Sequence, residues 1–508
     1  MSGSLEGLTQ ETIDKIVDVR KSAEAGIFND SGIYGYDLSS LVSLIPVITP
    51  WRDRVSRTKG NQGNPFAVWR SIMNVNNTQP SPAPGFDFSG NEIEIEEQDF
   101  QARYKPTSYS GLVTQDAQDL ATGYADAYAV ETFNVMNQLL IGQDRQQMGA
   151  QSFPLAPASA PVLTQQSVGG TIGEVEVFVG VAARTGTGYF YGNGNSQGAS
   201  NHTTFAAGST NSILATTAAT RGAVCYDWFQ SSNGTEFFYY TTTTVNSVTM
   251  TSVITANNPL PASLPDLSTV FRGASAIAAN DPAVTGVPTF VTTGDNGSGY
   301  PNDYDGLLAN LTGDYNGTGQ WVQQGTGTAN PSIFNSLNGA SLTLSGGTIN
   351  EIQEFIFMTL WNQVKASPTA IMVNAAQAQE IANQVLGSTG ATTFLNTDAS
   401  GRINVAAGGQ VGTIINAPAG GIQVPIEVHV SLPPGTIVGR MDRVPFPQAN
   451  ISSVFEERCL RDMAQFDYGI GRNPGVKGGG PRQEFELRTN SAFICKAPVA
   501  QAVLSNVA

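Results

Sequence analysis

The stretch that decides the fold is residues 114–147, TQDAQDLATGYADAYAVETFNVMNQLLIGQDRQQ. It contains no proline, and its larger apolar side chains, among them Tyr124, Tyr128 and Leu139, recur near helical spacing. At about 1.5 Å per residue, a helix of this length spans about 50 Å. No heptad is sustained over several turns, which argues against a coiled coil. The pattern therefore predicts one long helix that serves as the spine of its domain.

Residues 51–106, just before this helix, are expected to form a long two-stranded hairpin with a polar tip. Its second limb contains EIEIE at 92–96, an alternation with a period of two that is typical of a strand. An isolated hairpin is marginally stable in water, so this one is expected to lie on another surface. One limb is basic and the other acidic, with the charges on Arg52, Arg54, Arg57, Lys59, Glu92, Glu94, Glu96 and Glu97.

The N-terminal residues carry a short helix signal. Leu8 and Ile13 flank Thr9 as a hydrophobic staple flanks an N-cap, and glycines interrupt the pattern from Gly26 onward. A short amphipathic helix before a flexible stretch suits an arm that packs on a neighbouring molecule. A helix docked on its own domain is the open alternative.

After the long helix, the sequence pattern becomes typical of β-strands, and few residues are charged. In residues 160–275, valines alternate with other residues from Val175 to Val181, and turn residues recur every 8–12 positions. This spacing predicts an all-β sandwich. Further on, Asp295, Asp303 and Asp305 lack the ligand pattern of a calcium loop, so no metal site is expected there.

The remaining residues return to mixed α and β structure. Thr348 and Glu351 have the spacing of a capping box that opens a helix ending before Pro368. A short buried strand is expected at 370–373, followed by a helix that Asn374 caps and that runs to Leu386.

A hairpin is expected next, with strands 424–430 and 436–440 around a Pro-Pro-Gly turn, and then further strands over 450–505. The loop 473–481 interrupts these last strands.

The composition of the chain argues against several classes of function. The 508 residues include 25 basic and 41 acidic ones, a net charge of −16, which disfavours nonspecific binding to nucleic acid or to anionic lipid. The three cysteines are far apart, and neither of the two histidines accompanies a nucleophile motif. No cofactor, metal site or enzymatic activity is expected. Charge is scarce in residues 146–439, which hold 5 basic and 15 acidic residues, so most of it lies on the two flanks.

The order of parts resembles the tailed-phage major capsid protein with the Hong Kong 97-like fold. Residues 100–116 are similar to the return strand of that family's extended loop where it enters the spine helix. Residues 304–308, 348–361 and 368–386 are similar to its axial domain, and residues 424–440 and 456–503 to its peripheral strands. Residues 160–275 fall outside the family's plan and resemble an immunoglobulin-like or fibronectin-like insertion.

The resemblance implies an α+β fold with these parts in order. We expect an N-terminal arm at 1–50, an extended loop hairpin at 51–110 and the spine helix of the peripheral domain at 111–150. The β-sandwich insertion follows at 160–275, the axial domain at 276–425, and the peripheral strands with the C-terminus at 426–508.

The resemblance also implies a function. The chain would self-assemble into hexamers and pentamers of an icosahedral head around double-stranded DNA, without sequence-specific binding and without a membrane. Assembly would take place in the cytoplasm of a bacterial host, and the product would be the virion capsid. The partners would be separate scaffolding and portal proteins, together with cement proteins where the capsid uses them. The alternatives are an encapsulin-like shell and a Thr/Asn-rich surface-layer or adhesin protein; a glycosidase would need a carboxylate pair that no spacing singles out.

Contacts between subunits would then use the charged flanks. The arginines and the lysine of the basic limb are expected to pair across subunits with Glu92–Glu97, Glu456 or Glu457. The open alternative is that these charge runs are ordinary solvated faces, because exposed ion pairs contribute only about 0–1 kcal/mol each.

Overall fold

The computed structural model describes most of the chain after its N-terminal segment. The described residues are 49–60, 63–75, 95–121, 126–153, 155–191, 199–205, 210–234, 236–255, 277–278, 304–315, 321–322, 328–329, 333–345, 348–388, 394–397, 403–406, 411–444, 453–471 and 482–508. The expected N-terminal arm, the hairpin tip and the loop 473–481 therefore lie outside the described residues. Among the described helices, none is both long and apolar enough to cross a membrane.

The chain divides into two compact units. The ribbon unit comprises Pro106–Gln143 and Arg461–Asn490, and the sheet unit comprises Pro50–Lys105, Asp144–Leu460 and Ser491–Ala508. The fold is mixed α and β, as expected. Four elements contribute residues to both units: β4 (Lys105–Thr114), α3 (Ala127–Gly149), β25 (Phe455–Gly471) and β26 (Arg482–Cys495).

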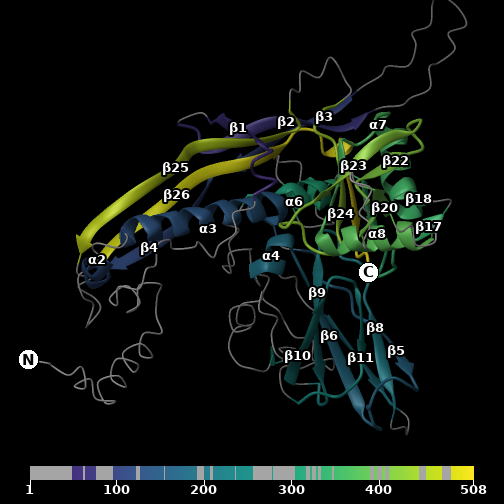
Figure 1. Cartoon of the computed structure of the whole chain (residues 1–508). Coiled ribbons are helices and arrows are strands. Elements are labelled where there is room, and N and C mark those ends of the chain that lie inside the picture. The colour runs from purple at the N-terminus through teal and green to yellow at the C-terminus, as the bar shows by residue number, and fades with distance from the viewer. Residues whose placement is uncertain are drawn as a thin grey trace, which may run out of the picture. The chain divides into compact units, whose positions relative to one another are not determined.

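In the ribbon unit, β25, β26 and β4 (Lys105–Thr114) are neighbours in one sheet (Figure 1). The predicted spine helix is present as α2 (Gln115–Ala121) and α3, and the residues between them lie outside the described chain. Apolar side chains explain the packing, because Val135 and Leu139 of α3 share one buried cluster with Phe485 and Leu487 of β26.

One glycine sets the spacing in this sheet. A Cβ atom at Gly111 of β4 would lie 2.2 Å from the Phe485 ring, so only a glycine lets the ring lie against the strand. The edge of the Tyr128 ring meets the same ring at 5.0 Å between centroids. Helix and ribbon are therefore held together by aromatic packing.

A six-stranded sheet lies at the centre of the sheet unit (Figure 1). Its strands, in spatial order, are β16 (Ile333–Ser336), β27 (Ala502–Ser505), β24 (Ile437–Arg440), β19 (Ala370–Val373), β23 (Ile422–Val428) and β22 (Thr413–Asn416).

Both faces of this sheet are covered. On one face, residues of the sheet pack with the π-helix η1 (Ile352–Met358), α7 (Thr359–Val364) and α8 (Ala375–Ser388). On the other face, they pack with α6 (Leu307–Thr312), Trp51, Phe455 and Phe493. All four residues of β19 are buried, as expected for a strand with cover on both sides.

The predicted hairpin of residues 424–430 and 436–440 is wrong. Strands β23 and β24 are both present, but β19 lies between them, parallel to β23 and antiparallel to β24. The wholly apolar β19 buries more surface in the centre of the sheet than at its edge. The expected boundary at 425/426 consequently falls inside β23, and one sheet contains strands that were assigned to the axial and the peripheral domains.

The predicted capping box at Thr348 and Glu351 is also wrong. Thr348 belongs to β18 (Thr348–Ile349), which pairs with β17 (Leu344–Ser345), and the Glu351 carboxylate accepts bonds from the amide and hydroxyl of Thr343 instead. The next predicted cap is confirmed, because the Asn374 side chain accepts a 3.1 Å bond from the amide of Ala376 at the start of α8.

The described residues between 160 and 278 form two antiparallel sheets that share one hydrophobic cluster (Figure 1). The larger sheet has the order β12 (Ile277–Ala278), β10 (Glu236–Thr243), β9 (Cys225–Ser231), β6 (Glu176–Arg184), β7 (Ala199–Thr204). The smaller sheet has the order β11 (Ser247–Met250), β8 (Ser212–Thr216), β5 (Val162–Gln166). One short helix, α4 (Gly186–Tyr191), departs from the expected all-β pattern.

These two sheets are packed closely on the rest of the sheet unit. A Cβ atom at Gly149, the last residue of α3, would lie 2.9 Å from the backbone of Gly186. Elsewhere, the Asn246 side chain donates to the Asn338 side chain at 3.2 Å. The two sheets therefore belong to the same compact unit as the central sheet.

The expected hairpin at 51–106 is present only in part. Strand β2 (Phe66–Val75) pairs antiparallel with β3 (Ile95–Arg103), whereas β1 (Ser56–Lys59) instead pairs parallel with β25. The hairpin lies on its own chain, since the Ile72 amide donates to the Lys496 carbonyl at 3.0 Å and Trp69 packs with Ile494.

Short paired strands complete the sheet unit. They are β13 (Asp314–Tyr315), β14 (Trp321–Val322), β15 (Thr328–Ala329), β20 (Phe394–Thr397) and β21 (Ile403–Ala406), and a 3₁₀ turn, η2, spans Pro498–Ala500.

Candidate interaction surface

Residues 50–60, here called the strap, carry the predicted basic residues and are fixed at their start by α3. The backbone amides of Trp51 and Arg52 donate to one carboxylate oxygen of Asp144 at 3.0 and 2.8 Å, and the Ser431 hydroxyl donates to the other. Burial raises the pKa of Asp144, while these bonds act in the opposite direction. A buried carboxylate thus joins the strap, α3 and the turn after β23.

The Trp51 ring anchors the strap in the core. It is fully buried and meets Phe455 at 5.1 Å between ring centroids, and the guanidinium of Arg440 lies 5.9 Å from its ring centre. The strap's charged residues therefore emerge from a fixed apolar anchor.

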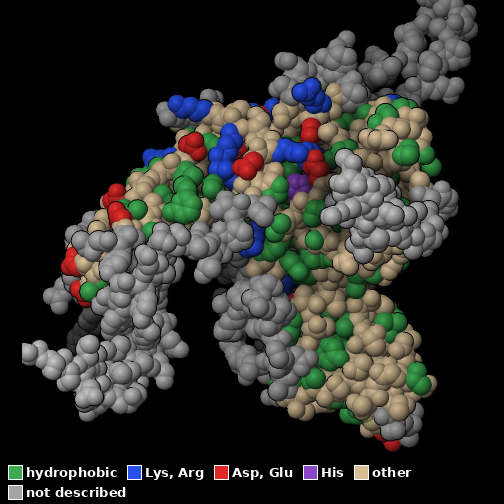
Figure 2. Space-filling model, in the orientation of Figure 1, with side chains coloured by type: hydrophobic (Ala, Val, Ile, Leu, Met, Phe, Trp, Pro, Cys, Tyr) green, Lys and Arg blue, Asp and Glu red, His purple; other side chains and the backbone are tan. Residues whose placement is uncertain are grey.

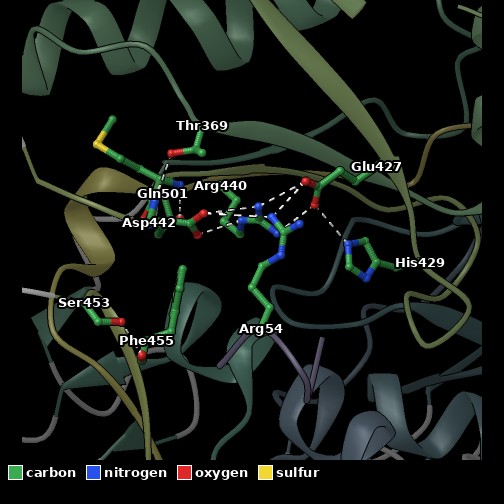
Figure 3. A network of polar contacts seen from close by, with 10 residues as sticks. Arg54, Thr369, Glu427, His429, Arg440, Asp442, Ser453, Phe455 and Gln501 are labelled. Atoms are coloured by element: carbon green, nitrogen blue, oxygen red, sulfur yellow. Dashed lines mark hydrogen bonds and ion pairs between the residues drawn. The ribbon is translucent and has the colours of Figure 1, made fainter. Parts of the chain in front are cut away.

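An ionic network surrounds Arg440, which is fully buried (Figure 3). Its guanidinium bonds the Glu427 carboxylate at 2.9 Å and contacts Asp442 at 2.8 Å. Arg54 of the strap adds a second cation to Glu427, at 2.8 Å. Arg440 is on β24 and Glu427 on β23, so their side chains meet across β19.

Glu427 is held in its ionised form. Burial alone would raise its pKa, but hydrogen bonds from His429 and Arg440 and the charges of both arginines lower it to about 2. His429 itself is buried, with its ring 3.5 Å from the Glu427 carboxylate. The network therefore ties the strap to the central sheet by charge.

A second ionic group lies where β1 pairs with β25. The Glu456 carboxylate accepts bonds from the Thr58 hydroxyl, from Arg458 at 3.0 Å and from Lys496 at 2.6 Å. Burial would raise the pKa of Glu456, but these donors lower it to about 2. On the opposite face, Arg57 pairs at 2.9 Å with Glu457, the residue directly beside it in the parallel register.

The outer face of the hairpin carries a third, exposed group. Arg70 of β2 contacts Asp99 at 2.7 Å and Glu97 at 3.5 Å, both on β3. The bond to Asp99 raises the pKa of Arg70 and lowers that of Asp99. Such exposed pairs contribute little to stability.

The structure brings several of the predicted contact residues together within one chain. Arg54, Arg57, Glu97, Glu456 and Glu457 all have intramolecular partners, and the Arg52 guanidinium lies 3.4 Å from Asp53. Lys59 is exposed and forms no ion pair with the part of the chain that the structure describes. Glu92 and Glu94 lie outside that part, and Glu96 is placed in β3 opposite Asn74. The pairing of these residues between subunits stays a prediction.

Sequence reasoning missed the partners that organise this surface. Asp144, Glu427, Arg440 and Lys496 were not singled out, although Glu427 lies in an alternating run that signals a strand. The remaining candidates have structural roles: Asp305 accepts bonds from Ser152, and His202 lies 3.6 Å from Glu176 on the neighbouring strand.

Charge is unevenly distributed over the sheet unit. In Figure 2 the visible charged side chains gather near β1 and β25, while the surface over β5, β6, β8 and β11 is almost free of them. Within the described residues, no group of three His, Cys, Asp or Glu side chains is arranged to hold a metal ion.

No model of a protein family matches the sequence, and no curated protein matches it. Solved structures that resemble it are shell proteins. The cyanophage A-1(L) capsid has a TM-score of 0.43 and 9% identity over 92% of this chain and 95% of its own. The capsid of a native GTA particle has a TM-score of 0.39 and 8% identity over 96% and 100%. The SrpI encapsulin complex from Synechococcus elongatus PCC 7942 has a TM-score of 0.36 and 9% identity over 92% and 93%.

Proposed function

We propose that the chain is the major capsid protein of a tailed double-stranded DNA phage, which self-assembles into hexamers and pentamers of an icosahedral head. The observation that carries the proposal is the return of the C-terminal strands. In the sequence, β25 and β26 follow the long helix α3 by more than 300 residues. In space, they lie in one sheet with β1 and β4, two strands that flank the hairpin and precede that helix. This order of hairpin, helix, sheet domain and returning ribbon is the order of the family that the sequence resembles.

Exposed apolar side chains in the ribbon unit support a role in assembly. Leu112, Leu120, Phe133 and Tyr468 are 47%, 48%, 49% and 62% exposed. Burying such apolar surface against another protein is favourable, because it removes that surface from water. Copies of the same chain would cover them in a shell.

Under this proposal, the parts of the chain have separate tasks. Residues 1–50 are an arm and the tip of the hairpin an extended loop, both reaching neighbouring subunits. The two sheets of residues 160–278 are an inserted β sandwich with an immunoglobulin-like character. Scaffolding, portal and cement proteins are the other partners, and the virion is the final location after assembly in the bacterial cytoplasm.

The ionic groups then have two roles. Arg54, Arg57, Glu456 and Glu457 are paired within the chain, so they shape the contact surface. Lys59, which forms no ion pair with the described residues, remains available for contacts between subunits. The enclosed DNA requires no tight binding, which agrees with a net charge of −16.

Size-exclusion chromatography with light scattering, followed by nuclease treatment, tests this function. The full chain is expressed with its candidate scaffolding protein and its assemblies are purified. We expect assemblies of many subunits that protect double-stranded DNA when they form in a phage-infected cell. Assemblies that enclose a cargo protein instead would favour an encapsulin-like shell, and a secreted monomer would favour a surface protein.

A further inference from the structure

A cavity of about 380 Å³ lies at the base of the hairpin, and the strap, β2 and β25 all line it. The strap contributes Lys59, the hairpin contributes Phe66 and Val68, and β25 contributes Arg458. These residues belong to the sheet unit, so the cavity, here called the hairpin cavity, is part of one compact unit. Its volume falls within the range of about 300–1,000 Å³ that is typical of small-molecule sites.

Two cationic side chains of the hairpin cavity have hydrogen-bond donors to spare. Arg458 donates one N–H to Glu456 at 3.0 Å and another to the Val68 carbonyl at 2.6 Å. A guanidinium has five N–H groups, so three of them have no partner in the part of the chain that the structure describes. Lys59 is exposed and has no ion pair there either. Both side chains can therefore bind a ligand without giving up a contact within the chain.

The Tyr104 hydroxyl adds a third donor to the cavity. Tyr104 is only 5% exposed, and a Cβ atom added to Gly60, which also lines the cavity, would lie 2.5 Å from the tyrosine oxygen. This hydroxyl makes no hydrogen bond to any described residue, although an unsatisfied polar group in such a position costs free energy. Burial raises the pKa of Tyr104, so the hydroxyl stays protonated and able to donate.

The charge of the cavity favours an anion. Among its described lining residues, Glu456 is the only carboxylate, and the Thr58 hydroxyl, Arg458 and Lys496 already donate to it. The positive charges of Lys59 and Arg458 exceed the one negative charge of Glu456, in a chain whose overall charge is −16. A ligand with several acceptor oxygens and a negative charge would use all the remaining donors.

The hairpin side of the cavity is apolar. Val68 is 50% exposed and Phe66 is half-buried, so both side chains offer apolar surface. Covering this surface would remove it from water, which is favourable. The ligand that fits both sides therefore has an anionic head and an apolar body.

We propose that the hairpin cavity binds a phosphomonoester with an apolar or aromatic body, with Lys59, Arg458 and Tyr104 holding its phosphate and Phe66 and Val68 contacting its body. A phosphate suits three separate donor groups, because it has three acceptor oxygens and a charge of about −1.5 to −2 at neutral pH. Such a ligand would join the strap, the hairpin and β25. It would stabilise the folded chain as its concentration rises, whether or not the chain forms a shell.

The direct test is isothermal titration calorimetry of phenyl phosphate into the dilute, unassembled full chain. We expect saturable binding at one site per chain, which weakens as salt rises because the contact is ionic. Inorganic phosphate lacks the apolar body and phenol lacks the charge, so each should bind at least about tenfold more weakly. Phenyl phosphate should also raise the thermal unfolding temperature of the chain.

Two variants locate the binding site. Lys59→Ala should weaken phenyl phosphate binding about tenfold, because it removes a charged donor. Tyr104→Phe removes only the hydroxyl and keeps the buried ring, and it should weaken binding about fivefold. Both variants should fold like the parent chain, since neither side chain bonds another described residue through the group that is removed. Thermal unfolding without ligand checks this.

Arg488→Ala is the matched control, because it removes a positive charge at an exposed position of the ribbon unit and should leave the affinity unchanged. Three results would overturn the proposal. The first is no saturable binding of phenyl phosphate by the parent chain. The second is equal affinity for phenyl phosphate and inorganic phosphate. The third is a loss of affinity in Arg488→Ala that equals the losses in Lys59→Ala and Tyr104→Phe, which would indicate general attraction of anions.

Discussion

The Glu427 carboxylate lies at the centre of the network that joins the strap to the central sheet. It contacts the buried Arg440 and the strap residue Arg54, and only Asp442 would still neutralise Arg440 if this carboxylate were lost. Removing one partner of a buried pair is costly, because it leaves the other charge without compensation.

Replacement of Glu427 by glutamine should therefore lower the free energy of unfolding by about 3 kcal/mol. Urea denaturation of the unassembled chain measures this loss. The matched control is Glu97→Gln, at the exposed pair with Arg70, which should cost less than about 1 kcal/mol. Similar losses in the two variants would show that the buried network does not stabilise the fold.

Two carboxylates predict a loss of stability in acid. The pKa values of Glu427 and Glu456 fall from an ordinary 4.5 to about 2 in the folded chain. Because the folded values lie below the unfolded ones, the stabilisation is complete above about pH 4.5 and disappears as the pH falls toward 2. Asp144, whose pKa is raised, acts in the opposite direction.

Urea midpoints measured at about pH 5 and about pH 3 should therefore differ more in the parent chain than in the double variant Glu427→Gln, Glu456→Gln. A pH dependence that is the same in both chains would assign the acid sensitivity to other carboxylates.

At the scale of the elements, the close approach of η1 to β24 depends on Gly439. A Cβ atom there would lie 2.5 Å from a methyl carbon of Ile356. Gly439→Ala should therefore cost about 1–3 kcal/mol through overpacking. Gly412 has open space around its Cβ position, so Gly412→Ala is the control and should change stability by less than about 0.5 kcal/mol. A neutral Gly439→Ala, judged by thermal unfolding, would mean that the helix can move away from the sheet.

The elements that the sequence predicted well carry their own local signal. The apolar spacing of the long helix, the four apolar residues of β19 and the Asn374 cap each depend on neighbours in the chain. The contacts that it could not predict lie between distant segments. Strand β1, Ser-Arg-Thr-Lys, has no apolar alternation. Its first residue, Ser56, pairs with Glu456, which lies 400 residues later in the sequence.

The same holds for the candidate interaction surface: its local features were predictable, and its contacts between distant segments were not. The charge runs at Arg52–Lys59 and Glu92–Glu97 were visible in the sequence, but their partners were not. Pairing of Arg440 with Glu427 requires the position of β19 between their strands, and only the strand order provides it. The sequence shows where the charged residues are, but the arrangement of the strands determines which of them form ion pairs within the chain.

At the scale of the whole molecule, the sheet unit has a strap with charged residues, and the ribbon unit exposes apolar side chains. Most predicted contact residues that the structure describes are paired within the chain, which leaves Lys59 as the residue that tests assembly without disturbing the fold. Under the proposed function, further copies of the chain cover these surfaces.

Negative-stain electron microscopy of the full chain, expressed with and without its candidate scaffolding protein, tests that claim most directly. The account predicts closed polyhedral particles built from rings of five and six subunits. A chain that remains a monomer in both preparations, at all concentrations reached, would contradict it.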